Sequence, residues 1–413
     1  MERIQVPRGT FDVLGEDALA RDALLATARA ILERAGYERI ETPTFEATEL
    51  FARGVGESTD VVQKEMYSFD DGGGRSLTLR PEGTAPVCRA YVEHGMHKRP
   101  QPVKLWYLSQ FFRAERPQAG RYRQFWQLGA EAIGSDDPAV DAELIALLHQ
   151  ILETLGAQGV RLRVGSLGTP ATRAAYREEL AAYLRAHDAE LSEDVRGRIE
   201  LNPLRAFDAD HPGTRRVMEN APRLLERLTD DDAAHFAEVR ALLDAADVPY
   251  EIDATLVRGL DYYTRTVFEF SSDALGAQSG VGGGGRYDGL IEQIGGQSTP
   301  GCGWAAGIER MLMAAQAQPV APPPVDLYVA AAGPEQRPAA FKLADDARRA
   351  GHAAQLELAG RSVKGVFKQA DRLGARYVAV VGPDGVTLKD MQAGEQQTVE
   401  LDTVMHHIRA GQL

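Results

Sequence analysis

Apolar positions near the start of the chain recur at helical spacing and then give way to strand-like runs. The helical positions are Leu24, Leu25, Ala28, Ile31 and Leu32. They predict a helix over residues 15–35, which Gly36 would end. Strand-like runs follow at residues 37–45, 76–80, 103–112 and 123–132. Because no long helix separates these runs, they favour an antiparallel sheet over a Rossmann alternation, and Pro43 assigns the first run to an edge or interface.

A helical pattern then interrupts the sheet. Residues 169–246 are rich in Ala, Leu, Glu and Arg and contain few β-branched residues, which is typical of helices. Sheet character returns at residues 250–254 and 266–271. We therefore predict an α+β domain over residues 1–318, built on an antiparallel sheet with flanking helices and carrying a helical insertion.

The chain changes character at a proline-rich segment, QPVAPPP. Such a segment is stiff and extended, so residues 319–324 are predicted to be a linker. Beyond it the patterns alternate, with strands at residues 326–331, 353–358 and 377–381 and helices up to residue 350 and at 363–373. This alternation predicts a smaller α/β domain over residues 325–413 with parallel strand pairings.

Charge restricts the functional classes. The 413 residues carry a formal net charge of -14, while 44% are hydrophobic and 26% are charged, as in an ordinary globular protein. Residues 324–413 contain eleven basic and eleven acidic side chains, so the negative charge belongs to the first domain. A chain this acidic is not a general nucleic-acid binder and by charge alone resembles a metabolic enzyme, but a local basic surface would be enough to bind a tRNA.

Cysteine usage and hydropathy point to a compartment. Cys88 and Cys302 are too far apart in the sequence for a CxxC-type zinc site. No stretch reaches the roughly 18 apolar residues of a membrane span, and the opening MERIQVPRGT is polar. We therefore expect a protein of the reducing cytoplasm with no membrane partner.

The most informative segment is FRAERPQAGRYRQFWQLGAE, residues 112–131. A hairpin there would bring Arg113 and Arg121 towards one site, and guanidinium groups suit phosphate oxygens. For the arginines alone, a solvated basic hairpin is the simpler interpretation. Gln127 and Glu131 favour a binding site, because strand alternation places both on one face, as a small polar ligand would require.

Three other segments carry candidate residues. In TLRPEGTAP, the carboxylate of Glu82 and the hydroxyl of Thr84 would hold an ammonium group or else cap a helix. In LVRGLDYYTRTVFEF, the two tyrosines could be core residues, but the charged start at Arg258 is harder to explain by packing. In GWAAGIERMLMA, Arg310 enters a helix and is either a surface residue or a contact to phosphate or adenine.

Two glycine-rich runs, residues 280–285 and 301–306, fit the GxGxxG/A pattern of dinucleotide-binding loops. Neither lies in a βαβ unit with an acidic residue at the expected distance, and the chain has no GxxxxGK(S/T) phosphate loop. The glycines are better explained by a close approach of the backbone to a ligand.

Together these segments resemble the class II aminoacyl-tRNA synthetases, and among them the histidyl-tRNA synthetases. The strand ending near Pro43 is similar to class motif 1, residues 112–131 to motif 2, and residues 303–310 to motif 3. RGLDYYTRTVFEF and GGGRYDGL resemble signatures of the histidine enzymes, while PRGTFD and NPLRAFD resemble further family segments. One local departure is Trp126, where many relatives have histidine or tyrosine. The resemblance implies a sheet of six or seven strands, a C-terminal anticodon-binding domain and a homodimer.

The resemblance also implies an enzyme that activates histidine with ATP and Mg²⁺ and transfers it to the histidine tRNA. It implies neither a protein nucleophile nor a tightly held, protein-ligated metal. Arg113 and Arg258 would be catalytic and would contact the α-phosphate and the histidine carboxylate. Arg121 and Arg310 would bind the outer phosphates, with Glu115 near the adenine.

The remaining implied roles concern histidine and tRNA. The α-amino group would be bound by Glu82, Thr84 and Gln127. A neutral imidazole presents one donor and one acceptor, which a carboxylate and a phenol match. The imidazole pocket would be formed by Glu131, Tyr262 and Tyr263. In the motif 2 hairpin, Arg116 and Gln118 would reach the acceptor end of the tRNA, and the C-terminal domain would read the anticodon.

Three other functions compete with this interpretation. The first is the regulatory subunit of ATP phosphoribosyltransferase, which resembles these synthetases but generally lacks the anticodon-binding domain and has eroded motifs. Here Arg113, Arg258 and Arg310 are all present. The second is a class II synthetase for proline or threonine, which Glu131 together with RGLDYY disfavours. The third is a nucleotide-dependent dehydrogenase, suggested only by the glycine runs.

Overall fold

The computed structural model describes residues 3–56, 59, 61–257, 259–316 and 324–410. The chain divides into two compact units, Met1–Pro319 and Val320–Leu413, each with its own sheet and core. Of the candidates from the sequence, Arg258 lies outside the described residues, as does most of the predicted linker. Within the described residues, no helix is both long and apolar enough to cross a membrane.

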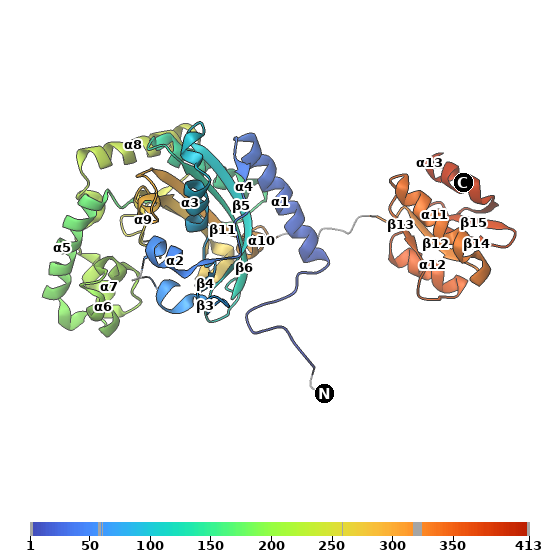
Figure 1. Ribbon diagram of the computed structural model, residues 1–413, viewed down its shortest axis with the longest axis horizontal. Coiled ribbons are helices and arrows are strands. Elements are labelled where there is room, and N and C mark those ends of the chain that lie inside the picture. The colour runs from blue at the N-terminus through green and yellow to red at the C-terminus, as the bar shows by residue number, and fades with distance from the viewer. Residues whose placement is uncertain (1–2, 57–58, 60, 258, 317–323, 411–413) are drawn as a thin grey trace. The chain divides into compact units, whose positions relative to one another are not determined.

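A large sheet organises the first unit (Figure 1). In spatial order its strands are β1 (Glu38–Arg39), β5 (Val103–Phe112), β6 (Gln124–Ile133), β11 (Gly301–Gly307), β10 (Gly280–Arg286), β9 (Thr264–Ser272), β7 (Val160–Ser166) and β8 (Glu251–Ile252). The six central strands pair antiparallel. The predicted antiparallel sheet is thus confirmed for the six central strands, while the two edge strands pair parallel and bring the sheet to eight strands against the six or seven expected. A two-residue strand is too short to show a hydrophobic period, which is why the sequence did not reveal the edges.

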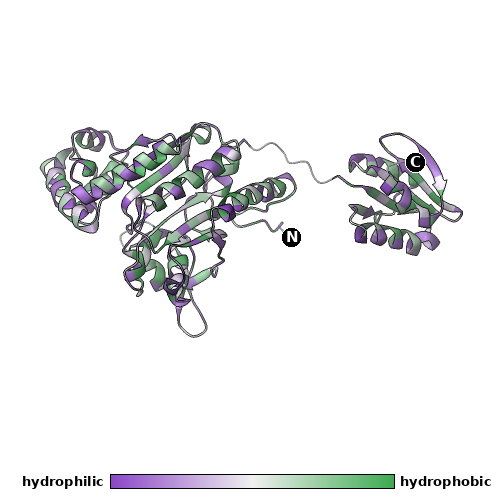
Figure 2. Ribbon diagram, turned by 90° about the horizontal axis from the view of Figure 1, so that it is seen from above, coloured by the Kyte–Doolittle hydropathy of each residue, from purple (hydrophilic) through white to green (hydrophobic). Residues whose placement is uncertain are grey.

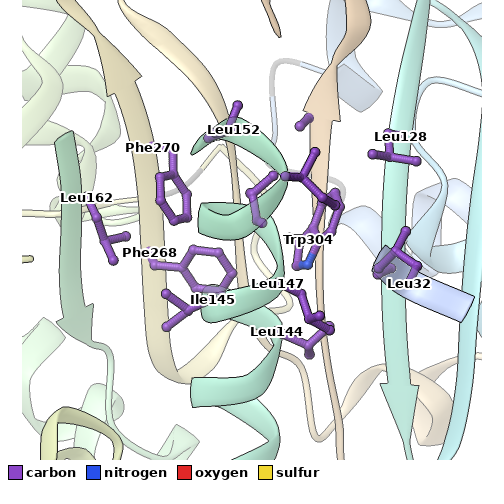
Figure 3. Packing of buried hydrophobic residues seen from close by; sticks show 14 of the residues in the cluster. Leu32, Leu128, Leu144, Ile145, Leu147, Leu152, Leu162, Phe268, Phe270 and Trp304 are labelled. Atoms are coloured by element: carbon purple, nitrogen blue, oxygen red, sulfur yellow. The ribbon is translucent and has the colours of Figure 1, made fainter. Parts of the chain in front are cut away.

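One face of this sheet is covered by helices and forms the main core. The helices are α1 (Glu16–Arg34), α4 (Pro138–Thr154), α8 (Asp230–Ala245) and α10 (Ile308–Ala314). Figure 3 shows α4 running along the sheet, with Ile145 beside Phe268 of β9 and with Trp304 of β11 on the other side of the helix. α4 begins where the Asp137 side chain accepts from the Ala139 N–H at 2.8 Å and Pro138 occupies the first turn. The predicted helix over residues 15–35 is α1.

The opposite face of the sheet carries a second apolar cluster and shorter helices. These are α3 (Thr84–Glu93) and α9 (Leu290–Gln293). In β5, Leu105 and Tyr107 belong to this cluster, whereas Trp106 between them belongs to the main core. The period-two alternation of each central strand therefore separates a helix-covered face from a face that is free to build a site.

The strand predicted at residues 37–45 is divided between two sheets. Its beginning is β1, while its end is β2 (Phe45–Ala47) of a small sheet with β4 (Ser76–Leu79) and β3 (Tyr67–Asp70). Pro43 has no N–H to donate to a ladder, and its carbonyl and that of Thr42 accept from the Arg80 guanidinium at 3.1 and 2.6 Å. The break turns the chain towards α2 (Thr48–Val55).

The residues between β7 and β8 are mainly helical. They form α5 (Pro170–Ala186), α6 (Glu193–Arg198), α7 (Pro212–Glu219) and α8, with single turns that include η4 (Pro203–Asp208). α5 starts at Thr169, whose hydroxyl accepts from the Thr172 N–H. α8 is different from the others, because Phe236, Val239 and Leu243 pack into the main core. This helical segment is therefore anchored on both faces of the sheet.

The second unit is a five-stranded sheet in the order β13 (Ala354–Leu356), β12 (Leu327–Ala331), β14 (Tyr377–Gly382), β15 (Gly385–Asp390) and β16 (Gln396–Val399). β13, β12 and β14 pair parallel as predicted, but β15 and β16 add antiparallel pairs that were not predicted. α11 (Arg337–Arg349) and α13 (Val404–Ala410) belong to the core on one face and α12 (Val363–Arg372) to that on the other. In Figure 2 the strands are mainly hydrophobic and the helices are striped, as expected for a sheet between helices.

A buried ion pair joins β10 to α4 beneath the first sheet. Arg286 and Asp141 are both fully buried, and the guanidinium contacts the carboxylate at 2.5 and 3.3 Å. Two carbonyls just before α4 also accept from Arg286, that of Ser135 at 2.9 Å and that of Asp137 at 3.2 Å. The Asp288 carboxylate accepts from the remaining donor at 3.2 Å, so every N–H of the guanidinium is used, which is the condition under which a buried charge is tolerated.

Asp141→Asn should lower the free energy of unfolding by about 3 kcal/mol, because it leaves the buried Arg286 charge with only the partly exposed Asp288 as a carboxylate partner. Urea denaturation followed by circular dichroism measures the loss. The matched control is Glu200→Gln, which breaks the exposed pair of Glu200 with Arg185 and should cost less than about 1 kcal/mol. Equal losses in the two variants would contradict the importance of the buried pair.

Candidate active site

A cleft of about 270 Å³ opens on the face of the first sheet that lacks α4. Its walls are the turn before α3, the β5–β6 hairpin, the segment 259–263 and the strands β9, β10 and β11. The sequence candidates that line it are Glu82, Thr84, Arg113, Glu115, Arg121, Gln127, Tyr262, Tyr263 and Arg310. Segments from six parts of the chain therefore converge on one site.

One end of the cleft is cationic. The hairpin closes through paired backbone hydrogen bonds between Gln118 and Arg121 at 2.9 and 3.0 Å. The guanidinium of Arg121 forms an ion pair with Glu115, and Arg113 lies 3.8 Å from the same carboxylate. Arg113 and Arg121 thus share one carboxylate partner, and Arg310 lines the same end of the cleft, where Glu269 and Glu309 add two further carboxylates.

Arg310 is held in place by backbone carbonyls. It donates to the carbonyl of Gly120 at 2.9 Å and to that of Gly280 at 2.6 Å. Burial, followed by the nearby charge of Arg121, lowers the pKa of Arg310 from its usual value. Burial and the neighbouring cation both destabilise the charged form of Arg310. An anion bound at this position would stabilise that charge.

The other end of the cleft presents acceptors. Glu82 accepts from the N–H groups of Thr84 at 2.7 Å and of Ala85 at 2.9 Å, so it does cap α3. It also lines the cleft, and so the helix-capping role and a ligand-binding role are compatible. Within the part of the chain that the structure describes, the buried Oε1 of Gln127 has no hydrogen-bond partner. A buried acceptor without a donor is costly, and a cationic ligand would satisfy it.

Glu131 lies one layer behind the cleft. Its carboxylate is fully buried and accepts hydrogen bonds from Tyr287 at 2.7 Å, Thr84 at 2.8 Å and Tyr107 at 3.3 Å. Burial raises its pKa to about 8, against the three hydroxyl donors that favour the charged form. The sequence placed Glu131 and Gln127 on one face, and the structure puts both there, Gln127 at the surface of the cleft and Glu131 beneath Thr84.

The two tyrosines form the wall beside Glu82. The rings of Tyr262 and Tyr263 are tilted with centroids 4.7 Å apart, and Tyr262 packs edge-on against Tyr287 at 5.9 Å. The Tyr262 hydroxyl donates to the Glu82 carboxylate at 3.4 Å. Arg258, which begins the same signature, lies outside the described residues. Arg116 and Gln118 are exposed on the outer hairpin and do not line the cleft.

Sequence reasoning missed Tyr107 and Tyr287 as part of this site. Tyr107 lies opposite Gly129 in the β5–β6 ladder, and a Cβ on Gly129 or Gly83 would come within 2.2 or 2.5 Å of its ring. A Cβ on Gly303 would come within 1.7 Å of the Glu131 carboxylate. Gly83 and Gly129, which stand next to the polar candidates in the sequence, are thus the signal that could have indicated a large side chain packed against them.

The two glycine-rich runs are the adjacent strands β10 and β11, paired antiparallel. Because both runs are strands, neither forms the loop before a helix that dinucleotide binding requires. Their glycines leave space for neighbouring backbone and side chains within the sheet and along the cleft. Among the described residues, no group of three His, Cys, Asp or Glu side chains is arranged to hold a metal ion.

An antiparallel sheet with a charged hairpin over its open face, a cationic site at the strand-to-helix junction of Arg310 and a separate α/β unit define a class II aminoacyl-tRNA synthetase. Residues 9–311 match the family model for histidyl-tRNA synthetase, and residues 326–411 match that for the anticodon binding domain. The chain belongs to the histidyl-tRNA synthetase family.

Individual relatives agree with the family models. The chain is 47% identical to a histidine–tRNA ligase of Bacillus cytotoxicus, with 98% of each chain covered. It is 45% identical to that of Halothermothrix orenii, with 98% of this chain and 99% of the other covered. The crystal structure of apo S. aureus histidyl-tRNA synthetase has a TM-score of 0.81 and 36% identity, over 98% of this chain and 100% of that one.

The activity follows from this membership. The chain is a ligase that activates histidine with ATP to the adenylate and transfers it to the 3′ end of the histidine tRNA. A Bacillus halodurans protein described as an ATP phosphoribosyltransferase regulatory subunit/histidyl-tRNA synthetase shares the fold at 23% identity and a TM-score of 0.66. Because the chain is 47% identical to a histidine–tRNA ligase over 98% of each chain, the regulatory-subunit alternative does not explain it.

The raised pKa of Glu131 predicts a pH dependence of stability. At pH values between the ordinary pKa of 4.5 and about 8, the Glu131 carboxyl holds a proton in the folded chain and releases it in the unfolded chain. The free energy of unfolding should therefore fall across this window as the pH rises. Glu131→Gln cannot titrate, so its stability relative to wild type should improve from about pH 5 to about pH 8 in urea denaturation. A constant difference between the two proteins would show that Glu131 titrates as an ordinary carboxyl.

Proposed function

We propose that histidine binds at the acceptor end of the cleft and ATP at the cationic end, so that the two reacting groups meet between them. The observation that carries this assignment is the buried, unpartnered Oε1 of Gln127 beside the carboxylate of Glu82. An ammonium group has three donors and no acceptor. It would satisfy Gln127, Glu82 and the hydroxyl oxygen of Thr84 together.

The imidazole would lie against Tyr262 and Tyr263 and point towards Glu131. Tyr263 would act as one partner of the ring nitrogens and Glu131 as the other. Thr84, Tyr107 and Tyr287 already donate to Glu131, so the imidazole N–H would replace or join one of these donors. A site that hydrogen-bonds its substrate in this way rejects analogues without those groups by about 10⁴–10⁵.

ATP would be held by the cationic end. Arg113 would contact the α-phosphate and the histidine carboxylate, Arg121 and Arg310 the outer phosphates, and Glu115 would lie near the adenine. The ion pair of Arg121 with Glu115 supports this arrangement, because it shows that the guanidinium binds an anionic group at this position. A triphosphate would take the place of that carboxylate. Arg258 would supply a further fixed cation at the α-phosphate.

Mg²⁺ would be bound together with ATP and would neutralise phosphate charge. Three carboxylates line the cleft near the arginines, Glu115, Glu269 and Glu309, and hard oxygen ligands of this kind suit the ion. Each is engaged with an arginine: Glu115 with Arg121, Glu269 with Arg163 at 2.6 Å and Glu309 with Arg21 at 2.8 Å. A carboxylate would have to leave its arginine to bind Mg²⁺, so phosphate and water would supply most of the ligands.

Histidine itself is the nucleophile in the first step. Its carboxylate oxygen attacks the α-phosphorus, and the bond to pyrophosphate breaks with the electron pair leaving on the pyrophosphate oxygen. The protein contributes by positioning both substrates and by stabilising phosphoryl charge, which is the pattern expected for phosphoryl transfer. In the second step the terminal ribose hydroxyl of the tRNA attacks the carbonyl carbon and AMP leaves.

The tRNA would contact two parts of the chain. Arg116 and Gln118 are exposed at the tip of the hairpin beside the cleft, as a contact to the acceptor end requires. The second unit would read the anticodon. We also propose a homodimer, because Phe45 and Phe69 remain 50% and 44% exposed on the small sheet that includes the motif 1 strand end. The cytoplasmic location stays a prediction.

Glu131→Gln should raise the KM for histidine by roughly ten- to a hundredfold, as expected when the imidazole loses a hydrogen bond to the carboxyl group. The KM for ATP should change by less than about twofold, because the cationic end stays formed. Histidine-dependent pyrophosphate exchange measures both. The matched control is Glu143→Gln, on α4 across the sheet, where the carboxylate pairs with Lys104. A larger change in the ATP constant would overturn the assignment of the two ends.

Removal of all residues after Gln318 should preserve adenylate formation and weaken tRNA charging. The apolar clusters of the first unit contain no residue from the second, so its core stays complete. The anticodon contact would be lost, and with it the effective concentration of the acceptor end. Oligomeric state, pyrophosphate exchange and charging are to be measured on one sample. A dimeric truncation that charges tRNA like the full chain would exclude anticodon binding as the main role of the second unit.

A further inference from the structure

Three polar side chains of the helical segment between β7 and β8 hold the segment 259–263, which forms one wall of the cleft. Asn202 donates to the Asp261 carboxylate at 3.4 Å, and Arg205 donates to the Gly259 carbonyl at 3.4 Å. Arg173 of α5 donates to the carbonyl of Tyr263. Two of the three donors belong to NPLRAFD, the sequence motif to which the catalytic scheme assigns no task.

Apolar packing couples the same two segments. Tyr176 and Leu204 of the helical segment share one buried cluster with Leu256, Tyr262 and Tyr263. The cluster continues without a boundary into the face of the sheet that carries the cleft. A displacement of α5 or η4 would therefore be transmitted to the two tyrosines, because close-packed interiors do not deform locally without cost.

The wall segment is supported from its other side by α2. The N–H of Asp261 donates to the carbonyl of Val55 at 3.2 Å. The next residue, Gly56, lies so close that a Cβ there would come within 2.8 Å of the Asp261 carboxylate. Residues 259–263 belong to no strand of the sheet, so their backbone is positioned by these flanking contacts instead of a ladder.

We propose that Arg173, Asn202 and Arg205 are positioning residues through which the helical segment sets the affinity for histidine. They touch neither substrate; they hold the backbone from which Tyr262 and Tyr263 enter the cleft. A ligand that moves the helical segment would in this way change amino-acid binding at a distance. The inference rests on the proposed assignment of these two tyrosines to the histidine pocket.

The test is histidine-dependent pyrophosphate exchange with the full chain and no tRNA. Arg173→Met keeps the apolar stem and removes the donors. It should raise the KM for histidine about tenfold, the effect of one hydrogen bond, and change the KM for ATP by less than about twofold. Arg173→Lys, which retains a donor, should recover part of the loss. The double variant Asn202→Ala with Arg205→Ala should act in the same direction.

The matched control is Arg185→Met on the same helix, whose partner Glu200 lies within the helical segment. It should leave both constants unchanged. Thermal unfolding of each variant separates positioning from instability: a change in the histidine constant at an unchanged Tm supports the proposal. Parallel changes in both constants, or an equal effect of Arg185→Met, would overturn it.

Tyr263→Phe distinguishes failure of this inference from failure of the pocket assignment. If Tyr263→Phe raises the histidine constant and Arg173→Met does not, the pocket assignment stands and the positioning role is wrong. If neither substitution changes the histidine constant, the histidine pocket is not at this wall and both proposals fail.

Discussion

The strict alternation of side chains along β6 is the constraint on which the rest of the first unit depends. Leu128, Ala130 and Ala132 point into the core beneath α4, so Gln127, Gly129 and Glu131 must point to the other face. A shift of one residue in the pairing of β6 with β5 or β11 would bury an amide and a carboxylate under a helix and expose the core. The helix-covered face therefore fixes the register, and the register places the polar residues of the cleft.

The polar groups on that open face are buried too, and each is tolerated for a specific reason. Glu131 has three hydroxyl donors, while Glu82 has the first N–H groups of α3. On the other side of the sheet, Arg286 has two carboxylates and two carbonyls. The buried oxygen of Gln127, by contrast, has no hydrogen-bond donor among the described residues, and we propose that a substrate ammonium binds there. An unsatisfied buried polar atom in a cleft is an indication of a ligand.

The helical segment between β7 and β8 looks like a separate body when it is read as a sequence insertion, yet its cluster merges with that of the cleft. Its helices cap themselves locally, at Thr169 and Ser192 for example. Its apolar side chains, by contrast, pack against the strands and tyrosines of the catalytic part. The segment is therefore stabilised both by its own helix caps and by its packing against the catalytic part.

Local chemistry was sufficient to predict the elements and the chemical types at the site. The spacing of Leu24, Ala28 and Ile31 defined α1, strand periods defined β5 and β6, and the motif residues predicted a synthetase with an anticodon-binding domain. Only the tertiary structure decided the two parallel edge strands and the break at Pro43. It also decided that the Tyr107 ring packs against Gly83 and Gly129, and that Glu131 lies behind Thr84. These depend on contacts between segments far apart in the chain. Periodicity reports which face a side chain takes, but it carries no information about which distant side chain meets it there.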